Sequence, residues 1–266
     1  MNEIVKYNNR LNLITFKNFL ASDCDYFMFL CCGLREKGGD TIQFTFQDIR
    51  RAVNLRNESN DDLEEALLTM NEKILASTGR IKDGQVTKQF NLFNDFETDS
   101  GRQLLTVSVN PKYAYILNDF SDGFTKFEFQ EFMLLSSKHS KTLYRLMKQW
   151  RTKGVYDVKV EDLKKYMDCP EMETRYFIRD VVKKALKELQ EKECFRDLTM
   201  KTSRDKAHGG PLKKLTFTFQ PEARTDPAAD QKPKRTARKN SFDNFTPRQR
   251  TAEEWEELER AAMNWK

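Results

Sequence analysis

The sequence predicts an α+β protein with two tandem winged-helix domains and a disordered C-terminal tail that ends in a short amphipathic helix. Three observations predict it: a basic helix runs directly into a β-hairpin pattern, an earlier stretch repeats the strand and helix before it, and the composition changes after residue 221. We expect an N-terminal domain over residues 1–135, a second domain over 136–221, a basic linker over 222–250 and a terminal helix over 251–266.

A weak internal repeat relates the two expected domains. Residues 44–53 and 158–167 lie 114 positions apart, and both show a short strand followed by Asp, an aliphatic residue and two basic residues that open a helix. At the same offset the apolar residues of a third helix also align. These are Leu63, Leu67, Leu68 and Leu75, which fall on Phe177, Val181, Val182 and Leu189.

Helix signals come first in the N-terminal domain and strand signals follow. A helix is predicted over 23–37, with Ser22 as its N-cap and Gly38-Gly39 as its stop. A strand around residues 42–46, a helix from about residue 47 and a helix from a Ser59 cap to residue 75 follow. Further strands are predicted at 78–82, 85–93 and 103–109, and then a short helix that begins at Pro111 and runs through 117.

The third helix of this domain is acidic, with Asp61, Asp62, Glu64, Glu65 and Glu72 against a single Lys73. Its charge opposes entry into a DNA groove, so we do not expect it to read bases. Two interpretations stay open. Either this helix is an exposed helix with no role beyond folding, or the domain contacts other proteins, for instance as a dimer interface. For the second we expect residues 103–109 to form an edge strand with backbone groups free for pairing.

The second domain begins with a helix over 138–151, capped by Ser136 or Ser137, whose buried stripe is Leu143, Leu146, Met147 and Trp150. The helix over 173–189 has a longer apolar stripe. It consists of Phe177, Ile178, Val181, Val182, Ala185, Leu186 and Leu189. Alternation around 198–201 and 215–219 then predicts two strands, joined by a flexible basic tip over 203–211.

Positive charge is concentrated in this second domain, where residues 136–221 hold 21 basic and 12 acidic residues, while 1–135 hold 15 basic and 20 acidic. Long cationic side chains reach phosphates and guanine edges, so the domain is predicted to face DNA. The candidate DNA-binding residues are Arg175, Arg179, Lys183, Lys184 and Lys187 on the helix, Lys201, Arg204, Lys206, Lys213 and Lys214 on the hairpin, and Lys138 and Lys141 on the first helix. The alternative is an ordinary solvated helix face.

Several other classes of protein are not indicated. The five cysteines form no Cys-x-x-Cys pair and leave one over, so we expect reduced thiols and a cytoplasmic protein, with neither a disulfide framework nor a zinc site. No signal segment or membrane span is expected. The only histidines, His139 and His208, lie 69 positions apart and no phosphate-binding glycine loop exists, so we expect no metal, no cofactor and no enzymatic activity.

Residues 124–132 and 134–150 resemble the linker and first helix of the plasmid replication initiator (Rep) proteins built from two winged-helix domains. Residues 104–110 with 113–118 resemble that family's first domain, and the resemblance covers about residues 10–220. It implies that the second domain binds repeated sites in double-stranded plasmid origin DNA, with local melting and recruitment of the host helicase or its loader and the host initiator. It also implies that the first domain self-associates, so that a homodimer in one state acts as a repressor.

Carried over by position, the family's groove-entering helix falls on residues 174–191. There Phe177 and Arg179 match its usual aromatic and basic pair. Members of the family often have a basic run here, whereas this chain has Ile178 and Asp180 on either side of Arg179. Arg175, Arg179 and Lys183 are therefore the stronger candidates for base contacts.

The composition after residue 221 is typical of a disordered linker, since prolines alternate with basic residues over 222–250. Such a segment adds non-specific DNA affinity. Residues 251–265 predict an acidic amphipathic helix with one apolar stripe, and this stripe is the candidate partner-binding set Trp255, Leu258, Ala262 and Trp265. Docking on the protein itself and recruitment of an external partner both stay open.

Three functions are compared. An origin-binding initiator without enzymatic activity predicts protection of phased repeats and unpaired bases in a neighbouring A·T-rich stretch. A winged-helix transcriptional regulator shares the DNA-binding half, but its deletion leaves plasmid maintenance intact. A DNA-nicking replication enzyme predicts a covalent protein–DNA product on supercoiled plasmid.

Overall fold

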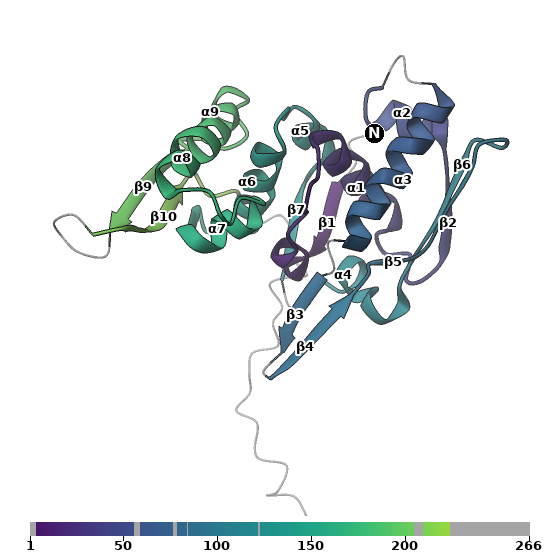
Figure 1. The fold of residues 1–266 in the computed structure, drawn as a ribbon, viewed down its shortest axis with the longest axis horizontal. Coiled ribbons are helices and arrows are strands. Elements are labelled where there is room, and N and C mark those ends of the chain that lie inside the picture. Colours follow the sequence, from purple (N-terminus) through teal and green to yellow (C-terminus); the bar gives the residue numbers. More distant parts are fainter. Residues whose placement is uncertain are drawn as a thin grey trace, which may run out of the picture. The chain divides into compact units, whose positions relative to one another are not determined.

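Two antiparallel three-stranded sheets with the same topology organise the computed structural model, which describes residues 4–55, 59–76, 79–83, 85–121, 123–204 and 210–223 (Figure 1). In the first sheet, β6 (Leu104–Val109) lies between β2 (Thr41–Thr45) and β5 (Phe93–Asp99). In the second, β10 (Leu212–Thr218) lies between β8 (Val155–Lys159) and β9 (Thr199–Arg204). The predicted α+β class with two winged-helix domains is confirmed.

The helices repeat in the same order as the strands. β2 leads into α2 (Phe46–Ala52) and β8 leads into α7 (Val160–Tyr166), and each is followed by a longer helix. In the first copy this helix is α3 (Asn60–Ala76), and in the second it is the helical run over residues 174–191. The internal repeat predicted from the sequence is therefore confirmed in the fold.

The predicted alignment of the third helices is right for their first half only. Leu63 and Leu67 are buried like Phe177 and Val181, but Leu68 and Leu75 are exposed; the remaining buried residues of α3 are Met70 and Ile74. A π-helical segment, η3 (Phe177–Val182), interrupts the second helix. Such a segment inserts one residue into the turn, so the buried positions beyond it are offset by one more residue.

Helix ends show which predicted caps form. Ser59 caps α3 as predicted, because its Oγ accepts from the Asp62 amide at 3.1 Å while the Asp62 carboxylate accepts from the Ser59 amide at 3.3 Å. The predicted Ser22 cap is wrong. The helix α1 (Ala21–Leu34) begins earlier, because the Asp23 carboxylate accepts from the Leu20 amide at 2.6 Å. In the second copy Ser137 is the cap of α6 (Lys138–Lys148).

The predicted edge strand is wrong, since β6 is the central strand of its sheet and both its sides are paired. The edges belong to β2 and β5 instead. The predicted strand over 85–93 is also divided: β4 (Val86–Phe90) pairs with β3 (Gly79–Asp83) in a separate hairpin, and β5 begins at Phe93. A register shift between Phe93 and Asp95 breaks the alternation of β5, so the sequence pattern did not indicate this strand.

A further pair of strands joins the beginning of the chain to the stretch that resembles a linker. β1 (Ile4–Asn8) pairs with β7 (Phe124–Glu128), with Val5 opposite Phe127. Other short elements complete this copy: η1 (Asn9–Leu13), η2 (Pro111–Tyr113), α4 (Tyr115–Asn118) and α5 (Phe129–Met133). The stretch that resembles the family's linker, residues 124–132, therefore forms β7 and most of α5.

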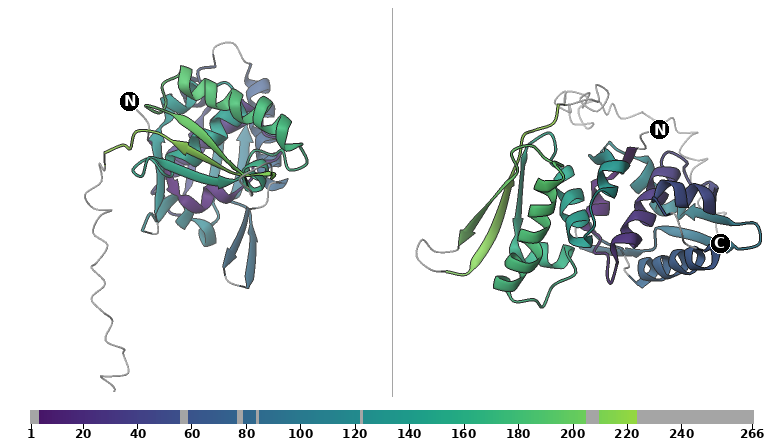
Figure 2. Two further views of the ribbon diagram at one scale, coloured as in Figure 1. Left: turned by 90° about the vertical axis from the view of Figure 1, so that its left-hand side faces the viewer. Right: turned by 90° about the horizontal axis from the view of Figure 1, so that it is seen from above.

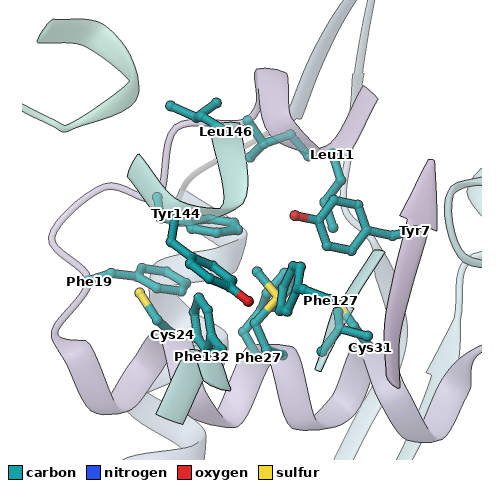
Figure 3. Close-up of a cluster of buried hydrophobic side chains, with 14 of the residues drawn as sticks. Tyr7, Leu11, Phe19, Cys24, Phe27, Cys31, Phe127, Phe132, Tyr144 and Leu146 are labelled. Carbon is teal, nitrogen blue, oxygen red and sulfur yellow. The ribbon is translucent and has the colours of Figure 1, made fainter. Parts of the chain in front are cut away.

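Aromatic side chains from both copies meet in one core (Figure 3). Tyr144 of α6 stands among Phe127 of β7, Phe132 of α5 and Cys24 of α1, and its ring meets that of Phe127 edge-on at 5.1 Å. Tyr144 and Phe132 are fully buried. Burial raises the pKa of the Cys24 thiol to about 12, so this cysteine is a packing residue rather than a nucleophile.

The helix α6 is buried on almost every side, including its basic residues Lys141, Arg145 and Lys148. The guanidinium of Arg145 donates to the carbonyl of Ile14 at 3.0 Å and to the Asn12 side chain at 3.1 Å, and it lies over the Phe16 ring. The ammonium of Lys148 lies between Glu131 and Glu222, at 3.2 and 2.7 Å. These cations hold α6 against the first copy.

A glycine closes the turn between α6 and β8. Gly154 has φ +73°, and an added Cβ would lie 2.6 Å from the Phe219 carbonyl oxygen. We expect Gly154→Ala to lower the free energy of unfolding by about 2–3 kcal/mol, because it combines backbone strain with a backbone clash. Gly38→Ala is the control: its φ is +63° with no atom within 4 Å of the added Cβ, so about 1 kcal/mol is expected. Urea denaturation measures both, and equal losses would contradict the clash.

Candidate nucleic-acid interface

The helical run over residues 174–191 separates an apolar face from a basic one. It consists of α8 (Thr174–Tyr176), η3 and α9 (Lys183–Glu191), and α9 packs on α6. Five residues of the predicted stripe are buried and Ile178 and Leu186 are partly buried; the buried ones are Phe177, Val181, Val182, Ala185 and Leu189. The predicted core face is therefore confirmed. Figures 1 and 2 show this helix alongside the β9–β10 hairpin.

The five predicted cations of this helix all lie on its exposed side. We call them the basic face: Arg175, Arg179, Lys183, Lys184 and Lys187. Within the described part of the chain, Arg175 and Lys183 make no side-chain ion pair or hydrogen bond, while Lys187 lies 3.5 Å from Glu191. The exposed ammonium and guanidinium groups of this face can reach a phosphate or a base edge without leaving a buried partner.

Glu188 interrupts the basic row in the sequence but turns away from it in space. Its Oε1 accepts from the Ser136 hydroxyl at 2.7 Å and from the Ser136 backbone amide. This carboxylate therefore ties the helix to the segment that precedes α6. Of the acids of this helix, Asp180 and Glu191 lie beside cations of the basic face, whereas Glu188 does not.

The aromatic residue on the basic face is Tyr176. Phe177, which the resemblance paired with Arg179, is fully buried and belongs to the core. Tyr176 is 44% exposed, and its ring centroid lies 5.0 Å from the Arg179 guanidinium carbon. Sequence reasoning missed Tyr176, although its position one residue before Phe177 turns it about 100° around the helix axis from the first residue of the apolar stripe.

Asp180 binds Arg179 with both carboxylate oxygens. Arg179 Nε donates to Oδ1 at 3.0 Å and Nη2 donates to Oδ2 at 2.7 Å. Hydrogen bonds from Arg179 hold the pKa of Asp180 below its usual value. Lys184 Nζ lies 3.9 Å from the same carboxylate, so Asp180 stands between two cations of the basic face.

The β9–β10 hairpin belongs to the same copy as the basic face and adds further cations to it. Lys201, Arg204 and Lys213 are exposed, and Arg204 Nη1 donates to the Gly210 carbonyl at 3.0 Å. Lys214 lies 2.9 Å from Asp157 of β8. The hydrogen bonds that Asp157 accepts from Thr216 and Lys214 lower its pKa. Lys206 lies outside the described residues.

Two candidates on α6 are engaged within the protein. The Lys141 side chain is 1% exposed, and its ammonium donates to the Asp25 carboxylate and, at 3.1 Å, to the Phe132 carbonyl. This burial removes Lys141 from the candidate interface, because a duplex cannot reach it. Lys138 is 31% exposed and lies 3.6 Å from Asp168, so its charge is already compensated.

The equivalent helix of the first copy has the opposite charge. Asp61, Asp62, Glu65 and Glu72 of α3 are exposed, as the sequence predicted. Its basic residue, Lys73, is bound to Asp23 of α1 at 2.7 Å. The exposed surface of the third helix is therefore acidic in the first copy and basic in the second.

The remaining expectations concern metals, membranes and the tail. Among the described residues, no three His, Cys, Asp or Glu side chains gather where a metal ion could be held. No helix of the described chain is long and apolar enough to cross a bilayer. The predicted linker, apart from Glu222 and Ala223, and the partner-binding residues Trp255, Leu258, Ala262 and Trp265 lie outside the described residues.

Comparisons with known proteins match both copies. Residues 4–148 match the family described as "Initiator Replication protein, WH1", and residues 159–219 match "Initiator Rep protein, WH2". A "Probable replication protein rep" of Bifidobacterium longum (strain NCC 2705) is 33% identical over 246 residues, which cover 92% of this chain and 81% of that protein.

A solved structure shares the fold. The chain described as "Crystal structure of Pi initiator protein in complex with iteron DNA" superposes with a TM-score of 0.63 at 15% identity, over 84% of this chain and 99% of that one. Both family models together span most of the sequence, and the first match extends through α6 while the second covers the helices and most of the sheet that follow it. The protein is therefore a member of the plasmid replication initiator (Rep) family with two winged-helix domains.

Proposed function

We propose that this protein initiates replication by binding repeated sites in double-stranded plasmid origin DNA with its second copy. The basic face enters the major groove and the hairpin cations Lys201, Arg204 and Lys213 lie along the sugar-phosphate backbone. Local opening of the origin, recruitment of a host helicase or its loader and of the host initiator, and repression of its own gene are parts of the same proposal.

The observation that carries the proposal is the opposite charge of two equivalent helices. A basic face on 174–191 attracts the polyanion, whereas the exposed acids of α3 repel it. Since the two copies share one topology, the difference in charge supports DNA contact by the second copy and protein contact by the first. Family membership supports the same assignment, and the Pi initiator in the solved structure is in complex with iteron DNA.

The proposal treats the protein as a binding factor without enzymatic activity, and it treats self-association of the first copy as the basis of repression. Supercoiled origin plasmid incubated with the protein and Mg²⁺ is expected to yield no covalent protein–DNA product. Sedimentation at increasing concentration is expected to show a monomer and a homodimer. A covalent product would favour a nicking enzyme instead.

The decisive experiment is a footprint on the DNA that surrounds the coding sequence. We expect several protected repeats in helical phase, together with permanganate-reactive bases in an adjacent A·T-rich stretch. Protection without reactive bases, combined with normal plasmid maintenance after deletion of the gene, would identify a transcriptional regulator. Absence of any protected site would overturn the proposal.

Base and phosphate contacts are separated by two substitutions. Arg175→Ala is expected to weaken binding of the protected repeat by about 1–3 kcal/mol, because it removes a contact to a base edge. Lys201→Ala is expected to weaken binding to all sequences alike and to reduce the salt slope by about one. Fluorescence anisotropy over a salt series measures both. Equal, small effects of the two substitutions would contradict this division.

A further inference from the structure

Three side chains of a single helical turn form a stacked and hydrogen-bonded unit on the basic face. The Arg179 guanidinium is held at its edge by both oxygens of Asp180, at 3.0 and 2.7 Å, and lies against the ring of Tyr176. All three side chains are at least partly exposed. The unit thus fixes a guanidinium at the surface that the proposed function assigns to DNA.

The hydrogen bonds leave one edge of the guanidinium open. Arginine carries five N–H donors in a planar fork, and Asp180 takes one on Nε and one on Nη2. Among the described residues, no other group accepts from Arg179. The edge formed by Nη1 and Nη2 therefore presents two parallel donors, which is the pattern that matches the O6 and N7 acceptors of guanine.

An acid at this position has an electrostatic cost for DNA binding, because it repels phosphates and offsets a neighbouring cation. The two-point contact between Asp180 and Arg179 does more than reduce the charge of the face, because it holds the guanidinium in one orientation. Fixing the guanidinium before binding reduces the conformational entropy lost in the complex and limits the directions in which it donates.

We propose that Asp180 is a positioning residue that orients Arg179, against the face of Tyr176, to read a guanine in each repeat. The inference rests on the proposed function, since it gives a task to a residue within the same DNA-facing surface. Arg179 is the residue that touches the base, Asp180 acts through it, and Tyr176 supports the plane of the guanidinium.

The test is a selection of bound duplexes from a pool with randomised base pairs, carried out with the full chain and sequenced quantitatively. The wild-type protein is expected to select one position with a strong guanine preference that Arg179→Ala abolishes. Asp180→Ala is expected to lower the preference at that same position about tenfold, while binding to non-specific duplex becomes tighter because a negative charge is lost. Asp180→Asn, which retains an acceptor, is expected to give a smaller loss.

Glu191→Ala is the matched control, because Glu191 is an exposed acid of the same helix and pairs with Lys187 at 3.5 Å. It removes the same charge and leaves Arg179 in place, so non-specific binding is expected to tighten without loss of the guanine preference. Tyr176→Phe keeps the ring and is expected to behave as wild type, whereas Tyr176→Ala is expected to lower the preference. Circular dichroism of each variant checks that the helix is formed.

Each outcome separates the inference from the proposed function. If the wild-type protein selects no sequence, the proposed function fails and the inference fails with it. If it selects a sequence, but Asp180→Ala tightens specific and non-specific binding equally, the initiator proposal stands and the positioning role of Asp180 is wrong. Loss of preference at a position different from the one lost in Arg179→Ala would also overturn it.

Discussion

Replacing Arg145 with alanine is expected to lower the free energy of unfolding by about 3–5 kcal/mol, because it leaves a cavity and takes a donor from buried carbonyls. Arg145 is 1% exposed, and its guanidinium donates to the backbone oxygens of Leu11 and Ile14 and to Asn12 Oδ1. Asn12 in turn accepts from the Tyr7 hydroxyl at 3.0 Å and donates to Thr125 at 2.8 Å. One substitution therefore disturbs a whole buried network.

Urea denaturation followed by circular dichroism measures this loss. Arg145→Lys is expected to fall between wild type and alanine, since an ammonium keeps the charge but cannot span the same acceptors. Arg175→Ala, an exposed arginine of the second copy, is the control and is expected to change stability by less than about 0.5 kcal/mol. A loss below about 1 kcal/mol for Arg145→Ala would show that the network does not stabilise the fold.

Lys141→Met is expected to make stability strongly pH-dependent, with a loss of about 3–5 kcal/mol at pH 8. The substitution leaves the Asp25 carboxylate buried without its cation. Burial already raises the pKa of Asp25 from 3.8 to about 6, against the lowering effect of Lys141, so removal of Lys141 raises that pKa further. At pH 8 the variant must ionise Asp25 in a largely buried site without a cation, whereas at pH 5 Asp25 stays protonated.

The sign follows from proton binding. The folded state holds the Asp25 proton to a higher pH than the unfolded chain does, so stability falls as the pH rises from about 4 through the folded pKa and is flat above it. Denaturation at pH 5 and pH 8 is expected to show a wider gap for Lys141→Met than for wild type. Adding Asp25→Asn is expected to restore most of the pH 8 loss, and a gap unchanged by that second substitution would contradict the pairing.

Features with local causes were predictable from the sequence. The apolar stripe of 174–191, the Ser59 cap and the repeated strand and helix all depend on residues a few positions apart. The exposure of Arg175 and Lys183 follows from the same periodicity, because they lie opposite Phe177 and Val181. The basic face was therefore predicted almost completely.

Features with distant partners were not predictable. Lys141, Arg145 and Lys148 have the spacing of an ordinary solvated stripe, yet Asp25, Asn12 and Glu222 draw them inward from far along the chain. Lys141 was assigned to DNA for this reason. The pairing of β1 with β7 and the bulged strand β5 also depend on tertiary contacts that no local pattern reports.

The buried cations of α6 limit where two relatives can be joined to make a hybrid protein. Consider a hybrid in which the first copy of one relative is joined, ahead of α6, to the second copy of another. Lys141 and Arg145 then lose their partners in the first copy, unless that copy also carries Asp25 and Asn12. A seam behind α6, near Gly154, is expected to keep Lys141 and Arg145 with Asp25 and Asn12, provided that the exchanged chain also supplies Glu222 as the second partner of Lys148.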